Sequence, residues 1–261
     1  MKTLYNMLLR RNLKINAVWG ISVGLIGLFV ILLYPYVIDI YASMTPEVLE
    51  IMAQFGGIPT SVLEYYATEG AMMIQLFGSI YAAILGFSLI VTFEAERTAE
   101  VLYVTGISKK TFFISKQIVL WTLVGLFSIM QYGIGLLGFS FVGESINQLD
   151  YLYFHLLNTV LLLVFSYLGF GFALLIKTTS KVMISLILPL PLYVLSFVSS
   201  LTEEPFIKNL KHISPFTFAD PVVIFKQEAT TDLISLVLYL GLVLMISSSF
   251  FWIYKKRIHV L

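Results

Sequence analysis

Residues 93–116, FEAERTAEVLYVTGISKKTFFISK, hold seven charged side chains between two long stretches that hold none. Residues 70–93 and residues 117–143 are 24 and 27 residues long, and neither stretch contains an Asp, Glu, Lys or Arg. About 20 apolar residues in a helix suffice to cross the hydrocarbon core of a bilayer. The pattern therefore predicts two membrane spans, joined by a charged helix-turn-helix at the membrane surface.

Four further stretches lack charge, namely residues 15–38, 151–176, 182–202 and 233–254. The whole chain is 59% hydrophobic and only 12% charged, and its mean hydropathy is +0.92. Soluble chains carry roughly 25% charged residues. Because lipid offers no hydrogen bonds to the backbone, each span must be a helix. We therefore expect an all-α integral membrane protein with six transmembrane helices, forming one domain over residues 1–261.

The charges also predict an orientation. With the N-terminus inside, 13 of the 16 basic residues fall in cytoplasmic segments, and 12 of the 15 acidic residues fall outside. Basic residues near the ends of spans favour the cytoplasmic side. Both termini are then cytoplasmic, as is the segment 94–116. The extracellular segments are residues 39–69, 144–150 and 203–232.

The segments outside the spans contain amphipathic patterns. Met1, Leu4, Tyr5 and Leu8 can share one helix face, which favours an N-terminal interfacial helix over a frayed basic anchor. Residues 203–232 mix apolar and charged side chains, which is typical of short helices that lie against the outer leaflet.

Few polar groups lie inside the spans. Gln75, Gln131 and Asn158 are more typical of hydrogen bonds between helices than of a substrate site, and His155 is expected at the membrane interface. Pro189 and Pro191 remove two backbone donors, so the fifth span should kink or break there. Small residues that permit close helix contacts are Gly20 and Gly24, Ala82 and Gly86, and Gly169 and Gly171.

No pattern of residues points to catalysis. The chain has no Cys, three His, and neither an H-E-x-x-H nor a G-x-S-x-G motif. Residues 106–111 lack the spacing of a phosphate-binding loop. We therefore expect no catalytic residue, no metal site and no cofactor site in this chain, and no enzymatic activity.

The charged segment 94–116 has the features of a helix, a turn and a second helix. Gly106 should end the first helix, and Ser108 can cap the helix that enters the third span. Val101, Leu102 and Val104 give the first helix an apolar flank, which favours a surface for a partner protein. The alternative is a solvated loop that carries only the charge needed for orientation.

These residues resemble a known family. The run Glu94-x-Glu96-x-Thr98-x-Glu100-x-Leu102, followed by Gly106-Ile107-Ser108-Lys109 and then by Lys116, is similar to the pattern of ABC-2-type transporter permeases. Arg97 stands where that family often has a glycine, and Gly106 stands where it often has a proline. Ser214-Pro215-Phe216 with Asp220-Pro221 also resembles the outer segment of the family, so the resemblance covers nearly the whole chain.

The resemblance implies the membrane-spanning subunit of an exporter in a cell membrane, with a bacterial plasma membrane favoured by the Lys, Ile and Phe content. Its partners would be a cytoplasmic ABC ATPase that binds ATP and Mg, a second permease subunit, identical or similar, and membrane lipid, but no nucleic acid. Coupling to the ATPase would fall to Glu94, Glu96, Arg97, Thr98, Glu100, Leu102, Gly106, Ser108, Lys109 and Lys110. A second cytoplasmic contact would consist of Lys177, Thr178, Ser180 and Lys181.

Two other classes of protein remain as alternatives. An ion-coupled carrier or channel would work without an ATPase, but such proteins often place charged residues inside their spans, and these spans have none. A membrane enzyme or scaffold would need clustered catalytic groups or a large soluble domain. An apolar pathway would suit amphiphilic peptides, lipids or drugs.

Overall fold

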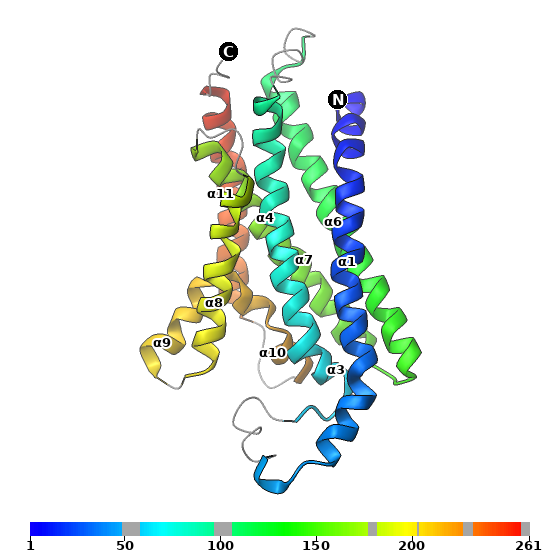
Figure 1. The fold of residues 1–261 in the computed structure, drawn as a ribbon. Helices are drawn as coiled ribbons and strands as arrows, with labels where there is room; N and C mark the ends of the chain where they lie inside the picture. The colour runs from blue at the N-terminus through cyan, green and yellow to red at the C-terminus, as the bar shows by residue number, and fades with distance from the viewer. Residues whose placement is uncertain (49–57, 97–105, 177–181, 203, 227–231, 257–261) are drawn as a thin grey trace.

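The computed structural model describes residues 1–48, 58–96, 106–176, 182–202, 204–226 and 232–256. Every regular element in these residues is helical, and none is a strand. Long helices run side by side and form an elongated bundle (Figure 1). They are α1 (Lys2–Ala42), α4 (Met72–Ala95), α6 (Lys109–Val142), α7 (Gln148–Leu175) and α11 (Leu233–Lys256). The shorter α8 (Pro189–Ser200) lies along one side of α4 (Figure 1).

Five helical segments are long and apolar enough to cross a membrane. They are Lys2–Ala42, Val62–Thr92, Lys109–Val142, Gln148–Leu175 and Met183–Ser200. The second of these begins with α3 (Val62–Tyr65) and the π-helical turn η1 (Tyr66–Ala71) and continues as α4. The described apolar part of α11, Leu233–Ser249, is shorter. The all-helical class predicted from the sequence is thus confirmed, and five of its helical segments fit a multi-pass membrane protein.

Helix α1 begins at Lys2 and continues unbroken for 41 residues. At 1.5 Å per residue it is about 60 Å long, roughly twice the hydrocarbon thickness of a bilayer. Leu4 and Leu8 are buried, and the Tyr5 hydroxyl lies 3.2 Å from the Thr122 hydroxyl of α6. Instead of a separate N-terminal helix, the first residues thus form the beginning of α1. Because α6 extends beside the first turns of α1, their apolar face packs against protein.

The bundle is built from two closely packed helix pairs, α1 with α6 and α4 with α7. In the second pair, a methyl group added to Gly86 would overlap the carbonyl group of Ser166. One added to Gly169 would overlap the carbonyl group of Ala83 in the same way. The predicted close contact of small residues is confirmed for this pair. The backbones of α4 and α7 can approach because both positions lack a side chain.

An aromatic cluster lies around Tyr66, which is fully buried. Its ring contacts Phe139 of α6, Tyr151 and Phe154 of α7, and Phe225 of α10 (Pro221–Lys226). Aromatic pairs in such edge and tilted arrangements add about 0.5–1.5 kcal/mol each beyond the area they bury. This cluster holds η1 against both helix pairs.

The fifth span is broken where the sequence predicts it. A 3₁₀ helix, η2 (Val182–Ile187), is followed by Leu188 and then by α8, whose first and third residues are Pro189 and Pro191. Proline has no backbone N–H, so it fits the first turn of a helix, and it ends a helix that precedes it. The predicted break is confirmed.

Short helices close the end of the bundle that lies away from Lys2. They are α9 (Pro205–Asn209), η3 (Leu210–Ile213), η4 (Pro215–Ala219) and α10. The Ser214 hydroxyl donates to the Leu192 carbonyl of α8 at 2.8 Å, and the Tyr239 hydroxyl of α11 donates to the Ile213 carbonyl at 2.5 Å. The sequence correctly predicts short helices in this region, and these bonds fix them to α8 and α11.

Candidate functional site

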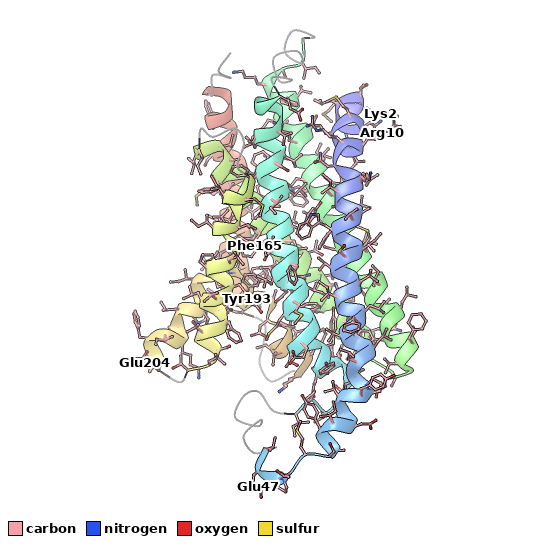
Figure 2. The ribbon with its side chains drawn as sticks, viewed as in Figure 1. Lys2, Arg10, Glu47, Phe165, Tyr193 and Glu204 are labelled. Atoms are coloured by element: carbon pink, nitrogen blue, oxygen red, sulfur yellow. The ribbon has the colours of Figure 1, made fainter. Side chains whose placement is uncertain are left out.

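The N-terminal end of the bundle is the end where α1 and α6 begin and where α4 and α11 end (Figure 1). Lys2 and Arg10 lie there on α1 (Figure 2). The other charged side chains described at this end are Arg11, Lys14, Glu96, Lys109, Lys110 and Lys116. One acidic group stands among seven basic ones, of which all but Lys116 reach the surface, so the described surface at this end is strongly basic.

Glu96 pairs with Arg11, which lies 85 residues earlier in the chain. This ion pair connects α1 to the segment that directly follows α4. The hydrogen bond from Arg11 lowers the pKa of the Glu96 carboxyl group, and the charge of the guanidinium group acts in the same direction. The two side chains are 35% and 45% exposed, so the pair contributes less than about 1 kcal/mol to stability. Sequence reasoning selected Glu96 but missed Arg11, because nothing local links them.

The turn before α6 has the geometry that its residues predict. Gly106 has a φ of 82°, a left-handed conformation that favours glycine. The Ser108 hydroxyl caps α6 by accepting a hydrogen bond from the backbone N–H of Thr111 at 3.1 Å. Lys109 and Lys110 begin the helix, where the helix dipole disfavours positive charge. Their presence there is therefore not explained by the stability of α6.

Lys116 lies two turns into α6 and is completely buried. Its Nζ atom is 4.3 Å from the centre of the Phe112 ring, a cation–π contact. A buried ammonium group is costly and persists only with compensating contacts. Sequence reasoning placed Lys116 at the entrance of the third span, whereas the structure encloses it within the protein.

Several residues of the predicted coupling site lie outside the described residues. They are Arg97, Thr98, Glu100 and Leu102, together with the whole second contact, Lys177, Thr178, Ser180 and Lys181. For Glu94 the backbone alone is described, as the penultimate residue of α4. The described part of the predicted site thus consists of Glu96, Gly106, Ser108, Lys109 and Lys110.

Two buried glutamines connect different helical elements, as the sequence predicts. Gln75 of α4 donates to the Ala219 carbonyl of η4 at 2.5 Å, and Gln131 of α6 donates to the Gly20 carbonyl of α1 at 2.7 Å. Such bonds contribute about 0.6 kcal/mol each on average in membrane helices. These two hydrogen bonds hold the helical elements in position, and the side-chain amide groups that donate them are already engaged within the protein.

His155 and Asn158 are different, because neither side chain has a hydrogen-bond partner among the described residues. Both are buried on one face of α7. The His155 ring contacts the rings of Tyr132, Tyr151 and Phe154, with the closest ring centres 4.5 Å apart. His155, expected at the membrane interface, is thus enclosed within the protein. The cause is that its face of α7 is covered by aromatic side chains.

A cavity of about 720 Å³ opens at the end of the bundle opposite the N-terminal end. It lies between α4, α8 and the short helices, and Tyr193 on its wall is labelled in Figure 2. Basic groups line it from α9 and η3, namely Lys208, Lys211 and His212. Acidic groups line it at Asp220 and Asp232. No local pattern of residues indicates this cavity, because its walls come from positions spread over residues 72–234.

The two acidic groups of the cavity differ in their surroundings. Burial raises the pKa of Asp220, although the backbone N–H groups of Val222 and Val223 donate to its carboxylate. Burial would also raise the pKa of Asp232, but hydrogen bonds from Ser235 and the His212 ring outweigh it and hold the pKa below its ordinary value. Asp232 lies 3.0 Å from the His212 ring. Both carboxylates cap helices: Asp220 caps α10, and Asp232 caps α11.

No group of three or more His, Cys, Asp or Glu side chains in the described part of the chain could hold a metal ion. Comparisons of this chain with protein-family models, with curated proteins and with solved structures found no match. Its function is therefore argued from its own residues and geometry.

Proposed function

We propose that this chain is the membrane-spanning permease subunit of an ABC-2-type ABC transporter, and that it acts as an exporter. In this proposal α11 is the sixth span, and the basic N-terminal end of the bundle faces the cytoplasm of a cell. The short helices and the cavity of about 720 Å³ then face outward. The strongly basic surface supports this orientation, because basic residues near span ends favour the cytoplasmic side.

One observation carries the proposal. The charged segment between α4 and α6 connects helices that belong to different packed pairs, α4 with α7 and α1 with α6. A force on this segment would therefore act between the two pairs and could shift one against the other. The interiors of closely packed pairs resist deformation, so the movement would be concentrated where the pairs meet.

The partner supplies the chemistry in this mechanism. A cytoplasmic ATPase subunit would bind and hydrolyse ATP with Mg, and its closure would push on residues 94–110 of this chain. Ser108 and Gly106 would fix the turn, and Lys109 and Lys110 would present charge to the ATPase. Arg11 would hold Glu96 in place through its ion pair. A second permease subunit would complete the pathway between the two copies.

The first test is purification of the chain from its own host in a mild detergent, followed by mass spectrometry of what co-purifies. We expect a stoichiometric subunit with a phosphate-binding loop. The charge-reversal variant Glu96→Lys should then reduce ATP-coupled transport at least tenfold while ATP hydrolysis by the partner persists. Glu144→Lys is a matched control, because it reverses one exposed acidic charge just after α6, at the opposite end. Purification of the intact chain alone would contradict the proposal.

A second candidate, an ion-coupled carrier, is favoured by one observation. His155 is a titratable group buried in the bundle, and it has no hydrogen-bond partner in the described part of the chain. Buried titratable groups in spans are frequently part of proton pathways. Transport by reconstituted protein that follows a pH gradient without ATP, and that is abolished by His155→Ala, would select this candidate.

A further inference from the structure

A second hollow, which we call the lateral groove, opens on the side of the bundle and has a volume of about 740 Å³. One wall is α1 between Ser22 and Leu33, and the other wall consists of Tyr65, Glu69 and Met73. Apart from Ser22, the Tyr65 hydroxyl and Glu69, the lining is apolar. In a membrane such a groove would be open to the acyl chains of the surrounding lipid.

Glu69 is the charged residue in this lining. It is exposed, and it makes no hydrogen bond or ion pair with any described residue. It lies within η1, and π-helical turns of this kind occur frequently at functional sites. A carboxylate that lines an otherwise apolar groove offers a complementary partner to a positively charged group.

One aromatic residue lines the lateral groove together with this carboxylate. It is Tyr65, which lies four residues before Glu69. Aromatic rings attract ammonium and guanidinium groups through their electron-rich faces. A carboxylate that shares an apolar groove with a phenol ring is thus suited to a cation and unsuited to an anion.

We propose that the lateral groove binds a cationic amphiphile, with its ammonium or guanidinium head at Glu69 and its apolar tail along α1 toward Ser22. Residues 22–33 of α1 extend over about 17 Å, which gives room for a long hydrocarbon or aromatic tail. As a binding site the groove stands on its own geometry. As the cargo site of an exporter it rests on the proposed function.

The charge of the head group, rather than the tail, should determine selectivity. A tail that leaves lipid for the groove exchanges one apolar environment for another, so it gains little from the hydrophobic effect. The head group instead meets a carboxylate in surroundings of low polarity, where electrostatic attraction is strong. Amphiphiles with the same tail and different head charge should therefore bind very differently.

The test uses the full-length chain in nanodiscs of phosphatidylcholine, without an ATPase. The probe is an alkyltrimethylammonium ion with a photoreactive diazirine in its tail, and the matched probe is an alkyl sulfate with the same tail. We expect the cationic probe to label peptides of α1 between residues 22 and 33 at least tenfold more than the sulfate does. Equal labelling by the two probes would overturn the proposal.

Three variants test whether labelling by the cationic probe depends on the Glu69 carboxylate. Glu69→Gln should lower labelling by the cationic probe about tenfold, and Glu69→Asp should retain part of it. Glu144→Gln removes the same charge from an exposed position outside the groove and should change nothing. If Glu69→Gln does not fold, unlabelled cationic and anionic amphiphiles can be made to compete with the probe on the wild-type chain. Only the cationic competitor should then reduce the labelling. Absence of labelling because a second copy of the chain covers the groove would also overturn the proposal.

These outcomes separate the site from the proposed function. Charge-selective labelling in a chain that co-purifies with no ATPase would preserve the site and reject the ABC assembly. Co-purification of an ATPase without charge-selective labelling would preserve the assembly and reject the site.

Discussion

The α3–α4 segment and the α8 segment are both apolar enough to span a membrane, but they are held in the molecule very differently. In the most apolar 18 residues of each, 72% are buried for Val62–Thr92 and only 17% for Met183–Ser200. Helix α4 approaches α7 through Gly86 and Gly169, whereas α8 follows a proline break and exposes Val194 and Val198. Hydrophobicity alone thus indicates that a helix lies in a membrane, but it does not indicate how firmly the helix is held.

The contrast has a functional consequence under the proposed function. The pair α4 and α7 would transmit force as a rigid unit because its backbones are in direct contact. Helix α8 would be free to shift, since few of its side chains are enclosed. The first turn of α4 lies between the cavity and the lateral groove, with Met72 lining one and Met73 lining the other.

The largest effect should come from breaking the contact between α4 and α7. Gly86→Ala forces a methyl group against the Ser166 carbonyl group and should lower the free energy of unfolding by about 3 kcal/mol. Gly241→Ala is the control, because a methyl group at that position of α11 has no heavy atom nearby. Thermal stability of both variants in detergent, followed by size-exclusion chromatography, measures the difference. Equal stabilities would show that the tight packing of this pair is not required.

A smaller effect should follow from loosening the attachment of α8. Ser214→Ala removes the hydrogen bond from the Ser214 hydroxyl to the Leu192 carbonyl group, at a cost of about 1 kcal/mol. Because this bond connects α8 to the short helices, hydrogen exchange of the α8 backbone should accelerate while exchange in α4 stays the same. Equal acceleration in both helices would contradict the independence of α8.

The ion pair at the N-terminal end should matter little for stability. Glu96→Gln should lower the free energy of unfolding by less than about 0.5 kcal/mol, because both partners are substantially exposed. Since the pKa of Glu96 is lowered in the folded state, its contribution is present above the ordinary carboxyl pKa and is lost as the pH falls through the folded value. Unfolding measured between pH 7 and pH 3, with and without the substitution, should show a difference that disappears at the acidic end.

The smallest effect is expected on the exposed face of α8. Val194→Ala should change the stability of the single chain by less than about 0.5 kcal/mol, because the side chain is 56% exposed. If a second permease subunit covers this face, the same substitution should weaken association, which native mass spectrometry can measure. A loss of several kcal/mol in the single chain would show that α8 is packed more firmly than its exposure indicates.

Local features of the sequence were predicted well. Ser108 caps α6, Gly106 adopts the left-handed conformation, and Pro189 begins a new helix, each as its residue type indicates. These features depend on neighbours within a few residues, so the sequence contains all that determines them. The identity of distant partners was not predicted, as the ion pair of Arg11 with Glu96 illustrates.

The amino-acid sequence by itself determined that the chain is helical, that several segments are apolar enough to span a membrane, and where the turn before α6 and the break before α8 lie. The reason is that backbone hydrogen bonding and transfer into lipid depend on each segment separately. Only the tertiary structure decided that α1 continues through its first turns, that His155 is enclosed by aromatic rings, and that Glu69 faces an apolar groove. Those outcomes depend on which helix faces meet, and a face is chosen by shape complementarity among all the helices together.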